Sequence, residues 1–154
     1  MKSLFSILAV LITAAIFYGC GNSSNQKKDE GAPPTSMVEE EVDPMENLGI
    51  GPIKSLELGV DIDSEMAANG KQYYDQLCSA CHKAEEKYIG PSPKGIFDRR
   101  SPEWVMNMIL NPVEMVKDDP IAKALLIEFN GAPMADQNVT EDQARAILEY
   151  FRTL

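Results

Sequence analysis

The chain has 154 residues, of which 44% are hydrophobic, and a formal charge of −10 at pH 7. This length accommodates one small domain of about 100 residues with additional segments, and it leaves little room for two domains. A nucleic-acid-binding protein would need a stripe of basic residues to displace the counterions of phosphate groups. The acidic composition therefore argues against that class of function.

Residues 1–19 are predicted to be a lipoprotein signal peptide. Lys2 precedes the uncharged run "LFSILAVLITAAIF", which has the length of a signal-peptide apolar region and is short for a membrane-spanning helix. The run ends in "FYGC", where a small residue directly precedes Cys20, and this pattern resembles the lipobox of bacterial lipoproteins. The resemblance implies that Cys20 is lipidated and anchors the protein to a bacterial membrane, facing the periplasm. The alternative is an ordinary secretory signal, and both interpretations predict export.

Residues 20–47 are predicted to be a disordered acidic tether behind the lipidated cysteine. The segment is rich in Ser, Asn, Gly, Pro and acidic residues, and its apolar residues follow neither a helical nor a strand period. Its consecutive glutamates at 39–41 fit a self-repelling, solvated linker. The tether would thus separate the membrane anchor from a folded domain.

Residues 48–63 are predicted to form an extended flap over the domain that follows. Leu56, Leu58 and Val60 alternate with polar residues, which is typical of a short strand or of an extended segment with one covered side. From Asp63 the apolar spacing changes to three and four residues, the period of a helix that Asp63 can cap. The domain is therefore assigned to residues 64–154.

Three further helices are predicted in the second half of the chain. The first covers 101–111, with a serine cap, a proline at the first helical position, and a second proline immediately after it. The second covers 119–131, opening with Asp-Pro and closing with Asn-Gly. The last covers 140–151, where Thr and Gln stand in capping-box spacing. These elements predict a mostly α domain.

The stretch "CSACH", from Cys78 to His82, contains two of the three cysteines and the only histidine of the chain. A zinc site would need three or four protein ligands, and no further histidine exists. A dithiol redox pair would be expected at a helix N-terminus in a βαβ unit, whereas this pair follows a helix. The spacing C-x-x-C-H is the attachment signal for c-type haem. The sequence therefore favours haem attachment through Cys78 and Cys81, with His82 directed at the iron.

From about Gly70 to Leu154 the chain resembles the class I c-type cytochromes, which carry a single haem. In that family a glycine and an aromatic residue four positions later lie on the N-terminal helix, as Gly70 and Tyr74 do here. Two apolar residues three apart lie on the C-terminal helix, as Leu148 and Phe151 do. The resemblance implies a cytochrome c-like orthogonal helix bundle around one covalently bound haem c.

The same resemblance implies that Met134, in the loop "GAPMADQN" before the last helix, is the second axial ligand of the iron. The alternative is a loop methionine beside an open or water-bound iron. Met106, Met108 and Met115 lie at helical spacings and are predicted to fill the core around the haem. Ligation by His and Met raises the reduction potential and leaves no vacant position on the iron.

Four further residues are expected around the haem by the same resemblance. The carbonyl oxygen of Pro91 would accept a hydrogen bond from His82, the alternative being that Gly-Pro only makes a rigid turn. Trp104 would pack on the haem edge, with its indole donor directed at a propionate or buried in the core. Arg99 and Arg100 would pair with propionates or remain solvated.

These features predict an electron-transfer protein rather than an enzyme, and no catalytic residue is assigned. The expected function is to carry single electrons between a quinol-oxidising complex and a terminal reductase or oxidase. The region from "SPEWVMNMILNP" to "APMADQN" resembles monohaem lipoproteins that accompany anaerobic respiratory enzymes, including nitrous oxide reductase. The alternatives are a haem-based sensor or small haem enzyme with an open iron site, and a binding module that the haem merely stabilises.

Overall fold

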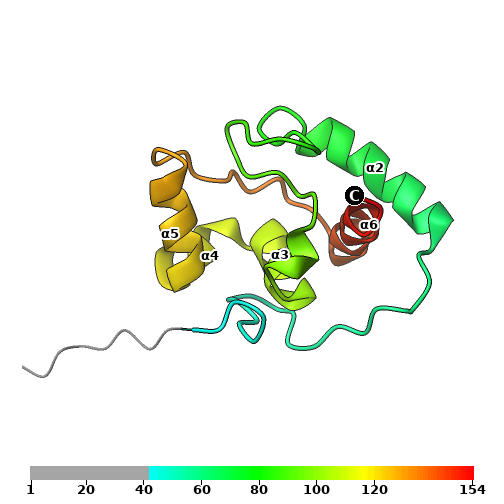
Figure 1. Cartoon of the computed structure of the whole chain (residues 1–154), viewed down its shortest axis with the longest axis horizontal. Helices are drawn as coiled ribbons and strands as arrows, with labels where there is room; N and C mark the ends of the chain where they lie inside the picture. The colour runs from blue at the N-terminus through cyan, green and yellow to red at the C-terminus, as the bar shows by residue number, and fades with distance from the viewer. Residues whose placement is uncertain (1–41) are drawn as a thin grey trace, which may run out of the picture. The chain divides into compact units, whose positions relative to one another are not determined.

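The computed structural model describes residues 42–154, and the predicted signal peptide and Cys20 lie outside this range. Within it, no residue lies in a strand and no helix is long and apolar enough to cross a membrane. The mostly α fold is thereby confirmed. The elements, in chain order, are α2 (Ser64–Leu77), the 3-10 helix η1 (Ile96–Asp98), α3 (Pro102–Leu110), α4 (Pro112–Asp118), α5 (Pro120–Glu128) and α6 (Glu141–Phe151) (Figure 1).

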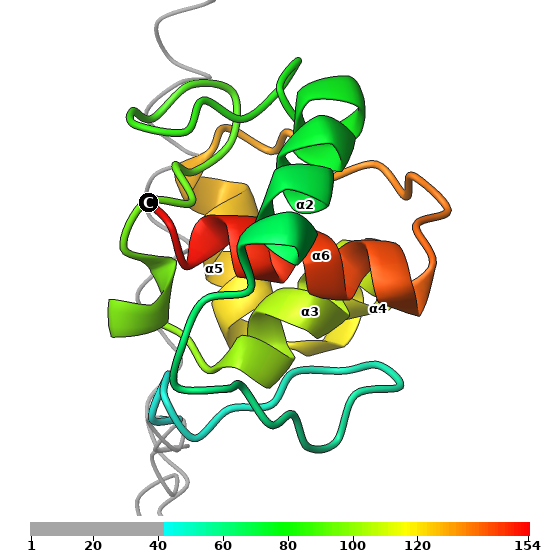
Figure 2. The same ribbon diagram turned by 90° about the vertical axis from the view of Figure 1, so that its right-hand side faces the viewer.

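The helices α2 and α6 cross each other, with α2 lying over the middle of α6 (Figure 2). Gly70 lies at the crossing, where a Cβ atom added to it would meet the carbonyl oxygen of Ala146 at 1.9 Å. Beside this contact the ring of Tyr74 packs on Tyr150 and Phe151, with ring centroids 5.3 and 5.8 Å apart. The absence of a side chain at Gly70 therefore permits the close helix approach that the sequence predicted.

The helix starts predicted from the sequence are confirmed by their caps. Asp63, Ser101, Asp119 and Thr140 each accept a hydrogen bond from a backbone N–H in the first turn of the helix that follows. At the other end of α5, Asn130 and Gly131 adopt positive φ angles of 58° and 74°, which stop the helix. Local side-chain chemistry thus sets these boundaries.

The sequence analysis did not predict α4. Pro112, which was expected only to stop the preceding helix, is also the first residue of α4, where its missing N–H costs nothing. Asn111, between the two helices, leaves the helical conformation with φ −142° and ψ 53°. The chain turns at this residue and continues as a second helix, which carries the fully buried Met115.

The segment 48–63 runs irregularly along α3 and contains no strand, so the strand alternative is wrong. Asn107 of α3 holds it: its Oδ1 accepts the N–H of Ile53 at 3.0 Å, and its Nδ2 donates to the carbonyl oxygens of Leu48 and Ile53 at 2.8 Å. The predicted alternation fails at Val60, which is 99% exposed. Side-chain to backbone bonds, rather than a sheet, therefore fix this segment.

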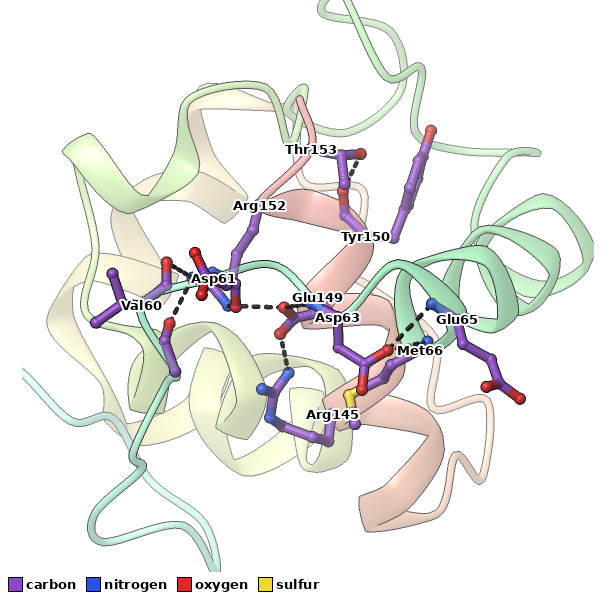
Figure 3. A network of polar contacts seen from close by, with 11 residues as sticks. Val60, Asp61, Asp63, Glu65, Met66, Arg145, Glu149, Tyr150, Arg152 and Thr153 are labelled. Atoms are coloured by element: carbon purple, nitrogen blue, oxygen red, sulfur yellow. Dashed lines mark hydrogen bonds and ion pairs between the residues drawn. The ribbon is translucent and has the colours of Figure 1, made fainter.

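The end of the segment is tied to α6 by Glu149, whose side chain is 1% exposed (Figure 3). Its carboxylate accepts hydrogen bonds from Arg145 Nη1 at 2.6 Å, from Arg152 Nη1 at 2.7 Å and from the backbone N–H of Asp63 at 2.9 Å. Arg152 also donates to the carbonyl oxygen of Gly59 at 2.7 Å. This network fastens the start of α2 to α6.

Candidate haem site

One cavity brings together every site residue that the sequence predicted within the described range. It encloses about 1400 Å³ of space, its open mouth included, and its walls come from the end of α2, the loop after it, α3 to α5, and the loop before α6. The predicted residues on its walls are Cys78, Cys81, His82, Pro91, Arg99, Arg100, Trp104 and Met134. Segments distant in sequence thus converge on one site.

A tight turn directly after α2 presents the two thiols and the imidazole to the cavity. The backbone N–H groups of Cys81 and His82 both donate to the carbonyl oxygen of Cys78, at 3.1 and 2.9 Å. The hydroxyl of Tyr74 donates to the carbonyl oxygen of His82 at 2.8 Å, and burial raises the pKa of this phenol to about 12. The turn is therefore anchored to the same tyrosine that packs at the α2 and α6 crossing.

The His82 ring is fixed in orientation by the loop that follows it. Its Nδ1 lies 2.8 Å from the carbonyl oxygen of Pro91, which is the contact expected between these residues. Since a carbonyl oxygen only accepts, Nδ1 carries the hydrogen, and the neutral form of the ring has its lone pair on Nε2. A Cβ on Gly90 would lie 2.4 Å from His82 Cε1, so the backbone of this glycine packs directly on the ring. His82 therefore has the tautomer of a metal ligand.

The two thiols differ in their surroundings. Cys78 is half-buried against the core and Cys81 is exposed. Burial, with a smaller effect of the neighbouring Cys81, raises the pKa of the Cys78 thiol to about 11. Burial therefore favours the protonated form of the Cys78 thiol.

Two of the four methionines considered lie on the cavity wall. Met134 comes from the loop between α5 and α6, and Met108 comes from α3. Met106 and Met115 are buried away from the cavity, and the Sδ of Met115 lies 2.9 Å from the backbone nitrogen of Ile50. The core role expected for Met106 and Met115 is confirmed, whereas Met108 is a second thioether at the site.

The indole of Trp104 makes a different contact from the one considered in the sequence. Its side chain is buried on the cavity wall, but the Nε1–H donates to Asp119 Oδ1 at 3.1 Å. The short helix α4, which the sequence did not reveal, returns the chain so that Asp119 lies behind Trp104. The indole donor is therefore used within the protein and is not directed at a propionate.

Arg99 and Arg100 have different surroundings: Arg99 bonds to the backbone of a loop, and Arg100 has a buried donor. Arg99 donates to the carbonyl oxygens of Ser92, Lys94 and Gly95, at 3.2, 3.0 and 3.3 Å. The Nε of Arg100 is the one buried side-chain polar atom without a hydrogen-bond partner among residues 42–154. Burial, aided by the charge of Arg99, lowers the pKa of Arg100. An anionic group in the cavity would satisfy this donor.

These residues fit haem c. Two thiols and a histidine lie on one turn, and a thioether lies on another wall of the cavity. Arg100, whose buried Nε has no partner among residues 42–154, also contributes to the wall. Most of the remaining wall is apolar. Much of it was not predicted from the sequence, although the apolar residues of "IAKALLIEF" indicate part of it. These further residues include Ile96, Ile109, Val116, Ala122, Leu125, Leu126 and Phe129.

Comparison with solved structures finds close likenesses. A cytochrome c from Rhodothermus marinus is 43% identical, with a TM-score of 0.65, over 67% of this chain and 88% of that one. An engineered form of it is 42% identical, with a TM-score of 0.64, over 67% and 89% of the two chains. The cytochrome c domain of a Pseudomonas putida protein is 24% identical, with a TM-score of 0.51 over 55% and 85%, and shows the fold alone.

The family models identify the same relationship. The cytochrome c model matches residues 67–154, which is more than half of the chain. A search of the curated proteins finds no match. The chain therefore belongs to the cytochrome c family, whose cofactor is a covalently attached haem c.

Proposed function

We propose that this protein is a lipid-anchored, monohaem c-type cytochrome that carries single electrons between a quinol-oxidising complex and a terminal reductase or oxidase. When bound, haem c supplies an iron that alternates between the ferric and ferrous states. Cys78 and Cys81 hold the group through two thioethers, each formed by addition of S–H to a vinyl group. His82 Nε2 and Met134 Sδ would be the two protein donors that hold its iron.

The observation that carries this proposal is the hydrogen bond between His82 Nδ1 and the carbonyl oxygen of Pro91, at 2.8 Å. It fixes the imidazole before any partner binds, and the backbone of Gly90 supports the ring from the side. A ligand held in this way keeps its position in both oxidation states, which suits electron transfer. With Met134 as the second donor, the iron would have no vacant position for a substrate.

Arg100 is the group that receives a haem propionate in this proposal. Its buried Nε has no partner among the described residues, and a carboxylate would form a charge-assisted hydrogen bond with it. Arg99 supports this position by bonding to three carbonyl groups of the loop before η1. Trp104 contributes only its ring to the wall, since its donor is bound to Asp119.

The membrane anchor rests on the sequence "FYGC" around Cys20, which lies outside the described residues. Replacing Cys20 with Ser is expected to release the protein from the membrane while its haem spectrum stays unchanged, because the anchor and the cytochrome domain are separated by many residues. Fractionation of cells that express each form measures this. Retention of the unlipidated variant on the membrane would contradict the anchor.

A haem sensor or small haem enzyme with an open iron position is the second candidate. One observation favours it: an engineered Rhodothermus marinus cytochrome c, 41% identical to this chain, is described as bound to a carbene intermediate. The two candidates differ in their response to carbon monoxide. A ferrous spectrum that carbon monoxide leaves unchanged supports the electron carrier, and a changed one supports the open site.

The proposed function is tested by electron exchange. The reduced holoprotein is mixed rapidly with purified terminal oxidoreductases, beginning with nitrous oxide reductase, and its oxidation is followed in the visible spectrum. We expect one of these enzymes to oxidise it faster than the turnover of that enzyme. Slow oxidation by all of them, together with a response to carbon monoxide, would favour the open site.

A further inference from the structure

Asn47, in the segment before α2, bonds to Asp119, which lies behind the wall of the haem cavity. The cytochrome c model matches residues 67–154 and therefore begins after this segment. The Nδ2 of Asn47 donates to Asp119 Oδ2 at 2.7 Å. The carbonyl oxygen of Asn47 accepts the hydroxyl of Ser101 at 2.5 Å, and its Oδ1 accepts the N–H of Gly49 at 2.7 Å. These bonds hold Asn47 in one orientation.

Asp119 is a buried acid, 2% exposed, that three N–H groups surround. Besides Asn47 Nδ2, it receives Trp104 Nε1 at 3.1 Å and the backbone N–H of Ala122 at 2.8 Å. Both of its oxygens accept hydrogen bonds, as those of a carboxylate do. No basic side chain of residues 42–154 forms an ion pair with it. Its hydrogen-bond partners are therefore all neutral, while the charge of Arg100 acts on it through space.

This carboxylate lies directly behind the haem cavity. Two of its three partners, Trp104 and Ala122, line that cavity. Asp119 also caps α5, so the same side chain fixes the start of the helix that forms much of the wall. A change at Asp119 can thus reach the cavity wall through Trp104, and a change at Asn47 can reach it through Asp119 and Trp104.

We propose that Asp119, held by Asn47, is a positioning residue for Trp104 and that its negative charge lowers the reduction potential of the haem. Through Asn47, residues 42–63 then influence this potential. This inference rests on the proposed function, because it requires a redox-active haem in the cavity. Ferric haem carries one more positive charge than ferrous haem, so a buried anion nearby favours the ferric state and lowers the potential. Each donor to the carboxylate weakens this effect.

The proposal predicts shifts of opposite sign in two variants. Asp119→Asn removes the charge and retains a capping oxygen, so the potential rises. Asn47→Ala removes one donor from the carboxylate and leaves its charge less compensated, so the potential falls. Loosening of the fold alone would admit water to the haem and lower the potential in both variants. A rise in Asp119→Asn therefore separates the electrostatic role from a structural one.

The experiment is a redox titration of the holoproteins with two matched controls. Asn111→Ala loosens the segment by removing the 3.3 Å bond to the carbonyl oxygen of Ile50, without touching Asp119. Glu103→Gln removes a charge from the helix that carries Trp104 and retains an oxygen for the N–H of Leu56. Both controls are expected to shift the potential less than Asp119→Asn does.

A second readout reports the positioning role directly. Trp104 is the only tryptophan of the chain, so ultraviolet resonance Raman spectra report on its indole N–H alone. The hydrogen-bond marker of the indole should weaken in Asp119→Asn and remain unchanged in Asn111→Ala and Glu103→Gln. An unchanged marker in Asp119→Asn would overturn the positioning role.

The remaining outcomes are also decisive. An unchanged or lowered potential in Asp119→Asn, with an otherwise normal haem spectrum, overturns this inference and leaves the proposed function intact. A wild-type protein without covalent haem overturns the proposed function instead. If Asp119→Asn does not fold, Trp104→Phe takes its place: it removes one donor from the carboxylate and must lower the potential, and an unchanged potential overturns the inference.

Discussion

Gly70 of α2 and Ala146 of α6 meet backbone to backbone, and a Cβ on Gly70 would lie 1.9 Å from the carbonyl oxygen of Ala146. The two helices that carry these residues cross each other (Figure 2). Tyr74, one turn further along α2, anchors the turn that carries His82. The closeness of the two helices therefore determines where the haem-binding turn is placed.

Replacing Gly70 with Ala is expected to destabilise the holoprotein by about 3 kcal/mol or more, since the carbonyl group it meets cannot give way as a side chain can. Denaturant unfolding, followed by far-ultraviolet circular dichroism, measures this. Gly59→Ala is the matched control, because the nearest atom to its Cβ is 3.6 Å away. Equal stability of the two variants would contradict the account of the crossing.

Replacing Gly90 with Ala is expected to push the His82 ring away from Pro91, because the new Cβ would lie 2.4 Å from Cε1. Loss of the Nδ1 hydrogen bond makes the imidazole a weaker donor to iron, so the reduction potential should rise. A redox titration measures the potential, and the Gly59→Ala variant should keep the wild-type value. If Gly90→Ala leaves the reduction potential unchanged, the hydrogen bond between His82 and Pro91 does not influence the potential of the iron.

Replacing Met134 with Ala is expected to leave the haem covalently bound while the iron loses a ligand. The sulfur-to-iron charge-transfer absorption should disappear and the potential should fall, because the thioether favours ferrous iron. Met108→Ala is the sharpest control, since Met108 also lines the cavity, and Met115→Ala controls for the core. If Met108→Ala removes the absorption and Met134→Ala does not, the assigned ligand is wrong.

Glu149 is expected to make stability depend on acid pH. Burial alone would raise the pKa of this carboxyl, but the hydrogen bonds from Arg145 and from the backbone of Asp63, with the charges of Arg145 and Arg152, lower it below its usual value. A lowered pKa contributes stability that is complete above the ordinary carboxyl pKa and is lost as the pH falls through the lowered one.

Glu149→Gln should therefore cost about 3 kcal/mol at pH 7, because it leaves two arginines without their anion, and this deficit should shrink in acid. Urea unfolding across the acidic range measures both effects. Asp75→Asn, which breaks the exposed pair with Lys71, is the control and should change stability little. A deficit that does not depend on pH would indicate that Glu149 acts through its shape alone.

The parts of the fold that depend on local chemistry could be predicted from the sequence. The caps at Asp63, Ser101, Asp119 and Thr140 define where four helices start, because each bond is formed within a few residues. The C-x-x-C-H stretch likewise predicted Cys78, Cys81 and His82 as haem-binding residues, and all three line the cavity. These features need no knowledge of the remaining chain.

The features that the sequence did not reveal depend on contacts between distant residues. Pro112 is compatible with both the end of one helix and the start of another, so α4 was missed. Without α4, nothing placed Asp119 behind Trp104, 15 residues earlier in the chain. Asn47 was assigned to the end of the predicted tether. Its partners, Ser101 and Asp119, are more than 50 residues away in the sequence, so no local pattern indicated that it is held in place.

The central claim, a single haem c held by His82 and Met134 for electron transfer, is tested most directly by a redox-titrated visible spectrum of the mature holoprotein. We expect one transition that fits a single electron, a sulfur-to-iron charge-transfer absorption in the ferric form, and a ferrous form that does not bind carbon monoxide. A protein that shows no covalently bound haem, or whose ferrous iron binds carbon monoxide readily, would contradict the account.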